Sequence, residues 1–384
     1  MNLIQQTKNT RFIRNRTYEA FIFLIIFGLF FGGLGYKMGI TNMLNTLMNT
    51  AWDLLMNTVF FIMGITVLSG ALGKLMIEFG VVRLLEFVLK PLMKPLYHLP
   101  GVASLAALMT FFSDNPAIIS LSNDKNFARY FRNYELISLT NFGTAFGMGL
   151  IVITFMTGLG FFWPAIIGLA GAVVGSVVST RLMQRMIKGK VPRRPDDDYQ
   201  GDESQISFRS EGPVFERVLN AVLDGGKQGV QLGLAIIPGV LIISTIVMMV
   251  TFGPADASAG YAGLAYEGVP VLPKLAGYLS GVFSFLFGFE SPELVAFPIT
   301  SLGAVGAALS LVKAFLAEGI VGGNEIAVFT AMGMCWSGYL STHTAMLDTL
   351  GYRRLTSKAL LSHTIGGLVA GVFAHYLFVI VGLF

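Results

Sequence analysis

The chain has 384 residues, of which 54% are hydrophobic and 12% charged, and its formal net charge is +4. Soluble domains carry about 25% charged residues, so the composition excludes an ordinary soluble domain and indicates a protein of the lipid bilayer. The basic residues fall in short segments between apolar runs, where orientation signals belong, so they do not indicate nucleic-acid binding. The single cysteine, Cys335, lies in an apolar run, which excludes a disulfide framework or a zinc cluster.

The chain opens with a basic segment, residues 1–17, followed by an apolar stretch at 18–37 that we interpret as a retained anchor helix. Most of the charge-free runs match the roughly 20 residues that a membrane-spanning helix needs. These runs are residues 20–36, 54–73, 136–180, 228–255, 294–312, 326–347 and 359–384. The longest, 136–180, predicts two spans joined by a turn at 157–160.

Three polar or mixed segments separate these runs. Residues 75–96 mix apolar and charged side chains, which is typical of a helix lying in the membrane interface. Residues 188–214 turn from basic to acidic and contain Pro, Gly and Ser, so they predict a mobile cytoplasmic linker. Two stretches, about 95–123 and 271–312, are predicted to enter the membrane and return on the same side as re-entrant helical hairpins.

The distribution of basic residues predicts the orientation. With the N-terminus in the cytoplasm, all but three of the 26 Lys and Arg residues fall on the cytoplasmic side, and the exceptions are Lys37, Lys274 and Lys313. The topology then has seven full spans and two hairpins, with the C-terminus outside. We expect the protein to be integral to the plasma (inner) membrane.

An internal repeat divides the chain into two related halves, predicted at residues 44–187 and 215–384. Asp114-Asn115-Pro116 recurs as Glu290-Ser291-Pro292 at a spacing of 176, and Thr140 and Gly143 recur as Thr330 and Gly333 at 190. Because the anchor helix precedes only the first copy, the two copies start on opposite faces of the membrane. The predicted fold is therefore an all-α polytopic membrane protein with two inverted-topology repeats, each of three spans plus a re-entrant hairpin, and one extra N-terminal span.

Inverted repeats of this kind underlie many secondary transporters, in which substrate binds where broken helices of the two copies meet. Proline is tolerated at the first helical position, and Asn115 or Ser291 directly before it can cap the exposed amides. An intramembrane carboxylate costs about 2.5 to 3.5 kcal/mol on insertion scales, so Asp114 and Glu290 are candidates for binding substrate or ion. The alternative is that both tips lie in the interface and the carboxylates only cap helices.

A second group of polar residues is predicted to line a cavity between the broken spans. It consists of Asn141, Thr144, Ser337, Ser341 and His343. Ser and Thr within a span often bond only to their own backbone, and a single helical His is often a packing residue, so both interpretations stay open. His343 and Asp348 are five residues apart on different helix faces, which disfavours an intramembrane hydrolase.

Residues 287–298 read Phe-Gly-Phe-Glu-Ser-Pro-Glu-Leu-Val-Ala-Phe-Pro and resemble the hairpin motif of concentrative nucleoside transporters, Gly-Gln-x-Glu-Ser-Pro-Leu followed by Pro. Residues 51–72 and 226–246 resemble the opening helix of Gate, or nucleoside-recognition, membrane proteins, a group that includes spore-maturation-type proteins. The resemblance implies that Glu290 helps to bind a nucleoside and that the hairpin tip, with Ser291, helps to form a sodium site.

Together these features predict a secondary transporter, not an enzyme, that moves a small polar or anionic metabolite, nucleoside-like by the resemblance. We expect coupling to sodium or protons, no cofactor or bound metal, and a site between the two hairpins. The expected partners are the substrate and the lipid bilayer, with a homo-oligomer possible and no nucleic acid. The alternative is a non-transporting scaffold or envelope-morphogenesis component of the Gate group.

Overall fold

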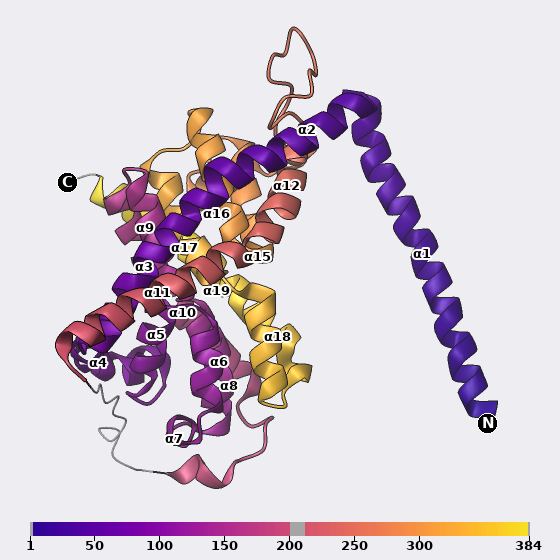
Figure 1. Cartoon of the computed structure of the whole chain (residues 1–384). Helices are drawn as coiled ribbons and strands as arrows, with labels where there is room; N and C mark the ends of the chain where they lie inside the picture. Colours follow the sequence, from indigo (N-terminus) through magenta and orange to yellow (C-terminus); the bar gives the residue numbers. More distant parts are fainter. Residues whose placement is uncertain (1–2, 200–211, 383–384) are drawn as a thin grey trace.

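A computed structural model describes residues 3–199 and 212–382, which form helices joined by loops and one isolated bridge between Asp256 and Gly260. Six of the described helical segments are long and apolar enough to cross a membrane. The chain is therefore an all-α polytopic membrane protein, as predicted. The inner end of the molecule is defined as the end at which α1 begins, and the outer end as the end at which α19 finishes (Figure 1).

The first helix stands apart from the rest. α1 (Leu3–Met38) is continuous, so the predicted cytoplasmic segment 1–17 and anchor helix 18–37 are one element within the described residues. Only 11% of its most apolar window is buried inside the protein. Figure 1 shows α1 leading away from the other helices, and it meets them at its outer end, where Met38 packs near Met249.

Two long antiparallel helical runs cross in the middle of the molecule (Figure 1). They are α2 (Ile40–Asp53), η1 (Leu54–Val59) and α3 (Phe60–Glu78), and α11 (Val214–Ala235), η5 (Gly239–Ser244) and α12 (Thr245–Thr251). A Cβ on Gly70 would lie 2.5 Å from the Gly225 carbonyl oxygen, and one on Gly225 would lie 2.3 Å from the Gly70 oxygen. Glycine is required at both positions because the two backbones touch there.

Each crossing helix contains a π-helical segment, η1 or η5. The Asn57 carbonyl oxygen in η1 accepts a hydrogen bond of 2.8 Å from Lys313 Nζ. The ammonium group of Lys313 also lies 3.8 Å from the centre of the Phe61 ring. Lys313 is one of the three basic residues that the predicted topology does not place on the cytoplasmic side. Its contacts join α16 of the second repeat to η1 and α3.

The remaining helices fall into two sets with the same order. The first set is α4 (Val81–Leu92), η2 (Met93–Tyr97), α5 (Ala103–Phe112), α6 (Pro116–Asn123), α7 (Lys125–Ala128), α8 (Asn133–Thr144), α9 (Gly149–Gly158) and α10 (Phe162–Ile187). The second set is α13 (Val271–Gly277), α14 (Ser280–Phe287), η6 (Pro292–Val295), α15 (Ala296–Gly303), α16 (Val305–Ala317), α17 (Gly323–Cys335), α18 (Tyr339–Thr349), η7 (Arg353–Leu355) and α19 (Thr356–Val381).

The two sets correspond at a constant offset of 190 residues. His98 ends η2 in the left-handed conformation with φ 53°, and Gly288 ends α14 in the same way with φ 71°. The break between α5 and α6 at Asp114 corresponds to the break between α15 and α16 at Ala304. The match of Asp114-Asn115-Pro116 with Glu290-Ser291-Pro292 at 176 is therefore wrong, because the two prolines open different helices of the repeat.

The second hairpin consequently lies at residues 292–317 instead of 271–312. The break predicted at Glu290–Pro292 is present and bends the chain by 72° between α14 and η6, but it precedes the hairpin. Ser291 and Glu318, at the two ends of the hairpin, line one cavity at the outer end. The residue at the tip of this hairpin, Ala304, does not line that cavity and lies beside Gly239 in η5. The chain therefore enters from the outer end and returns to it, so the re-entrant geometry is retained.

Both hairpins rest on interrupted spans. α8 and α9 are separated at residues 145–148, and α17 and α18 at 336–338, which are equivalent positions of the repeat. The predicted turn between α9 and α10 is confirmed, with Gly160 at φ 93°. α10 packs closely on α19, where a Cβ on Gly175 would lie 2.5 Å from the Gly366 carbonyl oxygen.

The linker departs from its prediction in the part that the structure describes. Arg194 Nη2 donates to the carbonyl oxygens of Ala128 and Phe131, each at 2.8 Å. The Asp197 carboxylate accepts from the Asn133 backbone N–H at 2.9 Å. Residues 188–199 are thus held against the start of α8 by specific bonds, which their polar composition did not reveal. Residues 200–211 of the predicted linker lie outside the described residues.

Candidate functional site

A cavity of about 640 Å³ lies between the tip of the first hairpin and the crossing of α3 with α11. Asp114 and Ser113 face it from the hairpin, and Ile151 lies at its wall on α9. The crossing helices contribute polar side chains, namely Thr66, Lys74, Gln228 and Gln231. Apolar helices thus line a cavity that presents one carboxylate, one ammonium group and two amides.

Of the predicted site residues, Asp114 is the one that lines this cavity. Its Oδ1 is enclosed, and no hydrogen-bond partner for it occurs among the described residues. A buried acceptor without a donor costs about 1 to 3 kcal/mol, more if charged, so such an atom requires an explanation. In a cavity, the simplest explanation is a donor group or cation that arrives with a ligand.

Asn115, the next residue, fixes the position of this tip. Its Nδ2 donates to Ser337 Oγ at 3.3 Å, and Ser337 Oγ donates to the Thr144 carbonyl oxygen at 3.1 Å. A Cβ on Gly147 would lie 2.1 Å from Asn115 Oδ1, and one on Gly338 would lie 2.5 Å from Nδ2. The amide therefore sits between the breaks of both interrupted spans, and glycine in each break makes room for it.

The other predicted polar residues lie behind the cavity or outside it. Asn141 is fully buried, and its Nδ2 donates to Ser179, Ser362 and the Ala359 carbonyl oxygen at 2.9 to 3.0 Å. Thr144 Oγ1 donates a hydrogen bond to the Thr140 carbonyl oxygen, one turn earlier in the same helix, as the alternative interpretation expects. His343 is fully buried as well, whereas Ser341 is exposed. None of the four lines the cavity that Asp114 faces.

Glu290 and Ser291 occupy different surroundings from Asp114. Glu290 is exposed and lines a shallow hollow with Asn324, Glu325 and His375, where α17 begins and α19 finishes. In this structure the Asp114 and Glu290 carboxylates therefore line two separate hollows. Likewise, Asp348 is exposed and lies 3.9 Å from Arg353, so it does not pair with His343.

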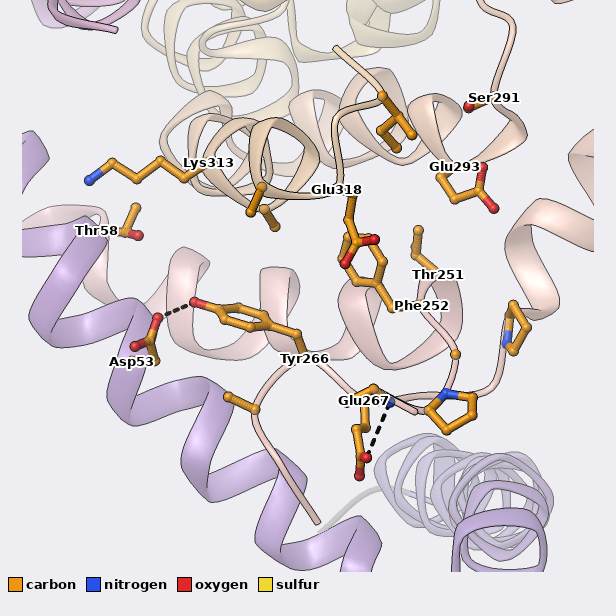
Figure 2. A pocket seen from close by; sticks show the side chains of 18 of the residues that line it. Asp53, Thr58, Thr251, Phe252, Tyr266, Glu267, Ser291, Glu293, Lys313 and Glu318 are labelled. Atoms are coloured by element: carbon orange, nitrogen blue, oxygen red, sulfur yellow. Dashed lines mark hydrogen bonds between the residues drawn. The ribbon is translucent and has the colours of Figure 1, made fainter. Parts of the chain in front are cut away.

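A second cavity, of about 780 Å³, lies at the outer end of the same crossing helices. Figure 2 shows the Tyr266 ring reaching from the loop after α12 to Asp53 on α2. Burial and the hydrogen bond to Asp53 raise the pKa of Tyr266 above its ordinary value. Glu293 and Glu318 face this cavity from the second hairpin, and Ser291 also borders it.

The loop that borders the outer cavity is built around Glu267, which is 1% exposed. Its carboxylate accepts hydrogen bonds from the backbone N–H groups of Ala262, Gly263 and Leu264 at 2.8 to 3.2 Å. Because these donors satisfy the buried charge, Glu267 is a structural residue that holds the loop against α2.

Sequence reasoning missed Gln228 and Gln231 because the run from 228 to 255 carries no charge and was interpreted as a plain span. The available signal was two amide side chains three residues apart, which places them on one face of a helix. Lys74 was counted only as an orientation signal. Its position near the end of α3 brings it to the rim of the Asp114 cavity.

Comparisons with known proteins agree with this architecture. The chain is similar to solved structures of the concentrative nucleoside transporter CNTnw, at 13–16% sequence identity across several conformational states. A substituted form in an outward-facing state gives a TM-score of 0.56 at 14% identity over 97% of this chain and 86% of that one. The substrate-bound inward-facing state gives a TM-score of 0.52 at 14% identity over 95% and 86%. The chain therefore has the fold of a concentrative nucleoside transporter.

Sequence comparison adds one relative. An uncharacterized protein of Alkalihalophilus pseudofirmus is 27% identical over 229 residues, which cover 54% of this chain and 47% of that protein. The chain thus spans about half the length of the curated relative that it matches. No protein-family model matches the chain. The relation to Gate and spore-maturation proteins stays a prediction.

Proposed function

We propose that the chain is a secondary transporter that moves a small polar or anionic metabolite, nucleoside-like in class, with coupling to a cation. The observation that supports this proposal most is Asp114, which lines a cavity at a hairpin tip and has one buried carboxylate oxygen, Oδ1, without a partner among the described residues. Transporters of this type bind substrate near the membrane midplane, at the interface of the repeats.

The positions of the two cavities support transport by alternating access, in which the path opens to one side of the membrane at a time. The run from α2 to α3 supplies Asp53 and Thr58 to the outer cavity, and Thr66 and Lys74 to the Asp114 cavity. The apolar tip of the second hairpin contacts residues 236–243 of the other crossing helix, between the parts that line the two cavities. A closed apolar contact between two polar cavities is the arrangement expected when one end of a transport path is shut. The similar CNTnw structures include outward-facing, intermediate and inward-facing states.

The cavity chemistry defines the substrate class. Asp114 supplies an acceptor, Gln228 and Gln231 supply both donors and acceptors, and Lys74 supplies a positive charge. This set suits a molecule with several hydroxyl, amide or ring nitrogen groups better than an apolar one. Asp114 and Asn115 also have one buried side-chain oxygen each without a donor among the described residues.

The test begins with a thermal-shift screen of purified protein against nucleosides, amino acids and organic anions, with and without sodium. Hits are then measured as uptake into proteoliposomes by wild-type protein and by Asp114→Asn. Loss of a buried charged partner typically costs 2 to 5 kcal/mol, so uptake by Asp114→Asn should fall by roughly 30-fold or more. The matched control is Asp348→Asn, which removes an exposed carboxylate. Wild-type uptake by a correctly inserted Asp114→Asn protein would refute the role of this carboxylate.

A further inference from the structure

The second hairpin carries one lysine in a helix that is otherwise uncharged. Lys313 is the single charged residue of α16, and the substrate site proposed above makes no use of it. The predicted topology places it away from the cytoplasmic side, against the usual tendency of basic residues. Because a charged side chain in such a segment is costly unless specific partners compensate for it, the contacts of Lys313 require an explanation.

Three residues of the first crossing run, α2 to α3, act on the Lys313 ammonium group. Its Nζ donates to the Asn57 carbonyl oxygen at 2.8 Å and lies 3.8 Å from the centre of the Phe61 ring. Asp53 is the carboxylate whose charge acts on it. These three partners follow one another at intervals of four residues, so they lie along one side of the run. Figure 2 shows the lysine side chain extending from α16 toward that run.

The partners of Lys313 are themselves held in place from the opposite direction. Asp53 Oδ1 accepts a hydrogen bond of 2.6 Å from Asn57 Nδ2, and Asp53 Oδ2 accepts one from the Tyr266 hydroxyl. The Tyr266 backbone N–H donates to Thr50 Oγ1 at 2.8 Å. The loop after α12 thus fixes the face of the first crossing run that receives the lysine.

The helix α16 is attached to both crossing runs. Near the hairpin tip it contacts the second run, where Ser244 Oγ donates to the Ala307 carbonyl oxygen at 3.0 Å. A Cβ on Gly239 in that run would lie 3.9 Å from the Ala307 methyl group. Further along the same helix, Lys313 attaches it to the first run. The tip contact is buried, whereas the lysine is only half-buried.

The lysine contact borders the outer cavity. Lys313 lines this cavity together with Glu318, which follows the end of α16. For the outer cavity to extend toward the hairpin tip, α16 must separate from the first crossing run, and Lys313 must then leave its carbonyl and its ring. Water can replace a hydrogen bond at a half-buried position, so this contact can be broken and formed again at lower cost than a buried ion pair.

We propose that Lys313 is a positioning residue that fastens the second hairpin to the first crossing run and so holds the outer end of the path closed. Without its charge, α16 keeps the tip contact but loses its attachment to the first run, and the hairpin leaves the closed position more often. The assignment to a transport path rests on the proposed function, whereas the fastening of the hairpin does not.

The direct test measures how often the hairpin leaves its position. The sequence has one cysteine, Cys335, which is buried, so a cysteine introduced by Ala307→Cys can be labelled separately. The protein in lipid nanodiscs is treated with a charged methanethiosulfonate reagent, and mass spectrometry follows the rate of labelling. Because Ala307 is fully buried, this rate reports the fraction of molecules in which the hairpin has opened.

Lys313→Met keeps the approximate length of the side chain and removes its charge and its N–H groups. We expect the Ala307→Cys protein to be labelled roughly tenfold faster with this change, because a cation–π contact and a charge-assisted hydrogen bond are lost. Lys313→Arg keeps both kinds of interaction and should restore a rate near the original one. The matched control is Lys274→Met, which removes an exposed lysine of the same repeat. An unchanged rate in Lys313→Met, or an equal rise in Lys274→Met, would overturn the proposal.

The native cysteine reports whether a variant has opened as a whole. If Lys313→Met also exposes Cys335 to the reagent, Phe61→Leu takes its place, since it removes the ring and retains the lysine. We expect labelling roughly threefold faster in Phe61→Leu with Cys335 still protected. An unchanged rate in that variant would then refute the fastening role.

The labelling assay needs no substrate, so it separates this proposal from the proposed function. If the wild-type protein takes up none of the screened compounds, the proposed function fails and the labelling rates still decide the role of Lys313. If uptake is measured but the labelling rates do not change, the role of Lys313 is refuted and the proposed function stands.

Discussion

The two re-entrant hairpins occupy equivalent places in the repeat but carry opposite chemistry at their tips. The first turns at Ser113-Asp114-Asn115 and the second at Gly303-Ala304-Val305. Asn115 inserts between two glycines and bonds Ser337, whereas Ala304 makes van der Waals contact beside Gly239. Under the proposed function, the first copy binds the substrate and the second closes the path by packing.

This asymmetry has a physical basis. A polar helix break inside the membrane is tolerated where it is buried in protein or lines a watery cavity, and the first tip does both. An apolar tip needs no such cavity, so it packs directly against the other crossing helix. There Gly306 lies close to Ile236 and Gly303 close to Ile243.

Of the substitutions that test the difference between the two hairpin tips, Gly147→Ala is expected to have the largest effect on uptake. The added methyl group would lie 2.1 Å from Asn115 Oδ1, so the amide must leave its position between the two breaks. The side chain can rotate away at modest cost to stability, but the tip then loses its bond to Ser337. We expect uptake of the substrate identified by the thermal-shift screen to be lost while the protein stays folded in size-exclusion chromatography. Normal uptake would show that the polar tip does not depend on this placement.

An intermediate effect is expected from a matched pair of glycines, Gly143 on α8 and Gly333 on α17. A Cβ on Gly143 would lie 2.4 Å from Ile118 of the first hairpin, whereas one on Gly333 would lie 3.2 Å from Val305 of the second. Gly143→Ala should destabilise by about 1 to 3 kcal/mol through overpacking. Gly333→Ala should be close to neutral, because helix propensity favours alanine by about 1 kcal/mol. Thermal unfolding in detergent measures both, and equal shifts would contradict the difference between the hairpins.

The smallest effect is expected from Glu290→Gln. The side chain is exposed in a hollow separate from the Asp114 cavity, and surface substitutions usually change stability by less than about 0.5 kcal/mol. Uptake should therefore stay near the wild-type level in the assay in which Asp114→Asn fails. A loss comparable to that of Asp114→Asn would restore the role that the resemblance to nucleoside transporters implies for Glu290.

The sequence predicted the class of fold, the inverted repeats and Asp114, because these depend on charge, apolar run length and helix-breaking residues. It misaligned the second hairpin because proline favours the first position of any helix, so Pro116 and Pro292 matched although they open different helices. The true counterpart of Asp114, Ala304, has no local signal. Asn141 and His343 were identified as polar residues within spans, but no pattern shows whether such side chains face a cavity or satisfy each other inside a bundle.

The backbone contact between Gly70 and Gly225 has a consequence for how the molecule can change shape. Helices whose main chains touch cannot rotate or slide past each other without first separating, so we expect α3 and α11 to move as one rigid pair. If one opening of the membrane path is to close while the other opens, the displacement then occurs in the hairpins and the interrupted spans that pack on this pair. The two crossing helices stay fixed while those elements shift.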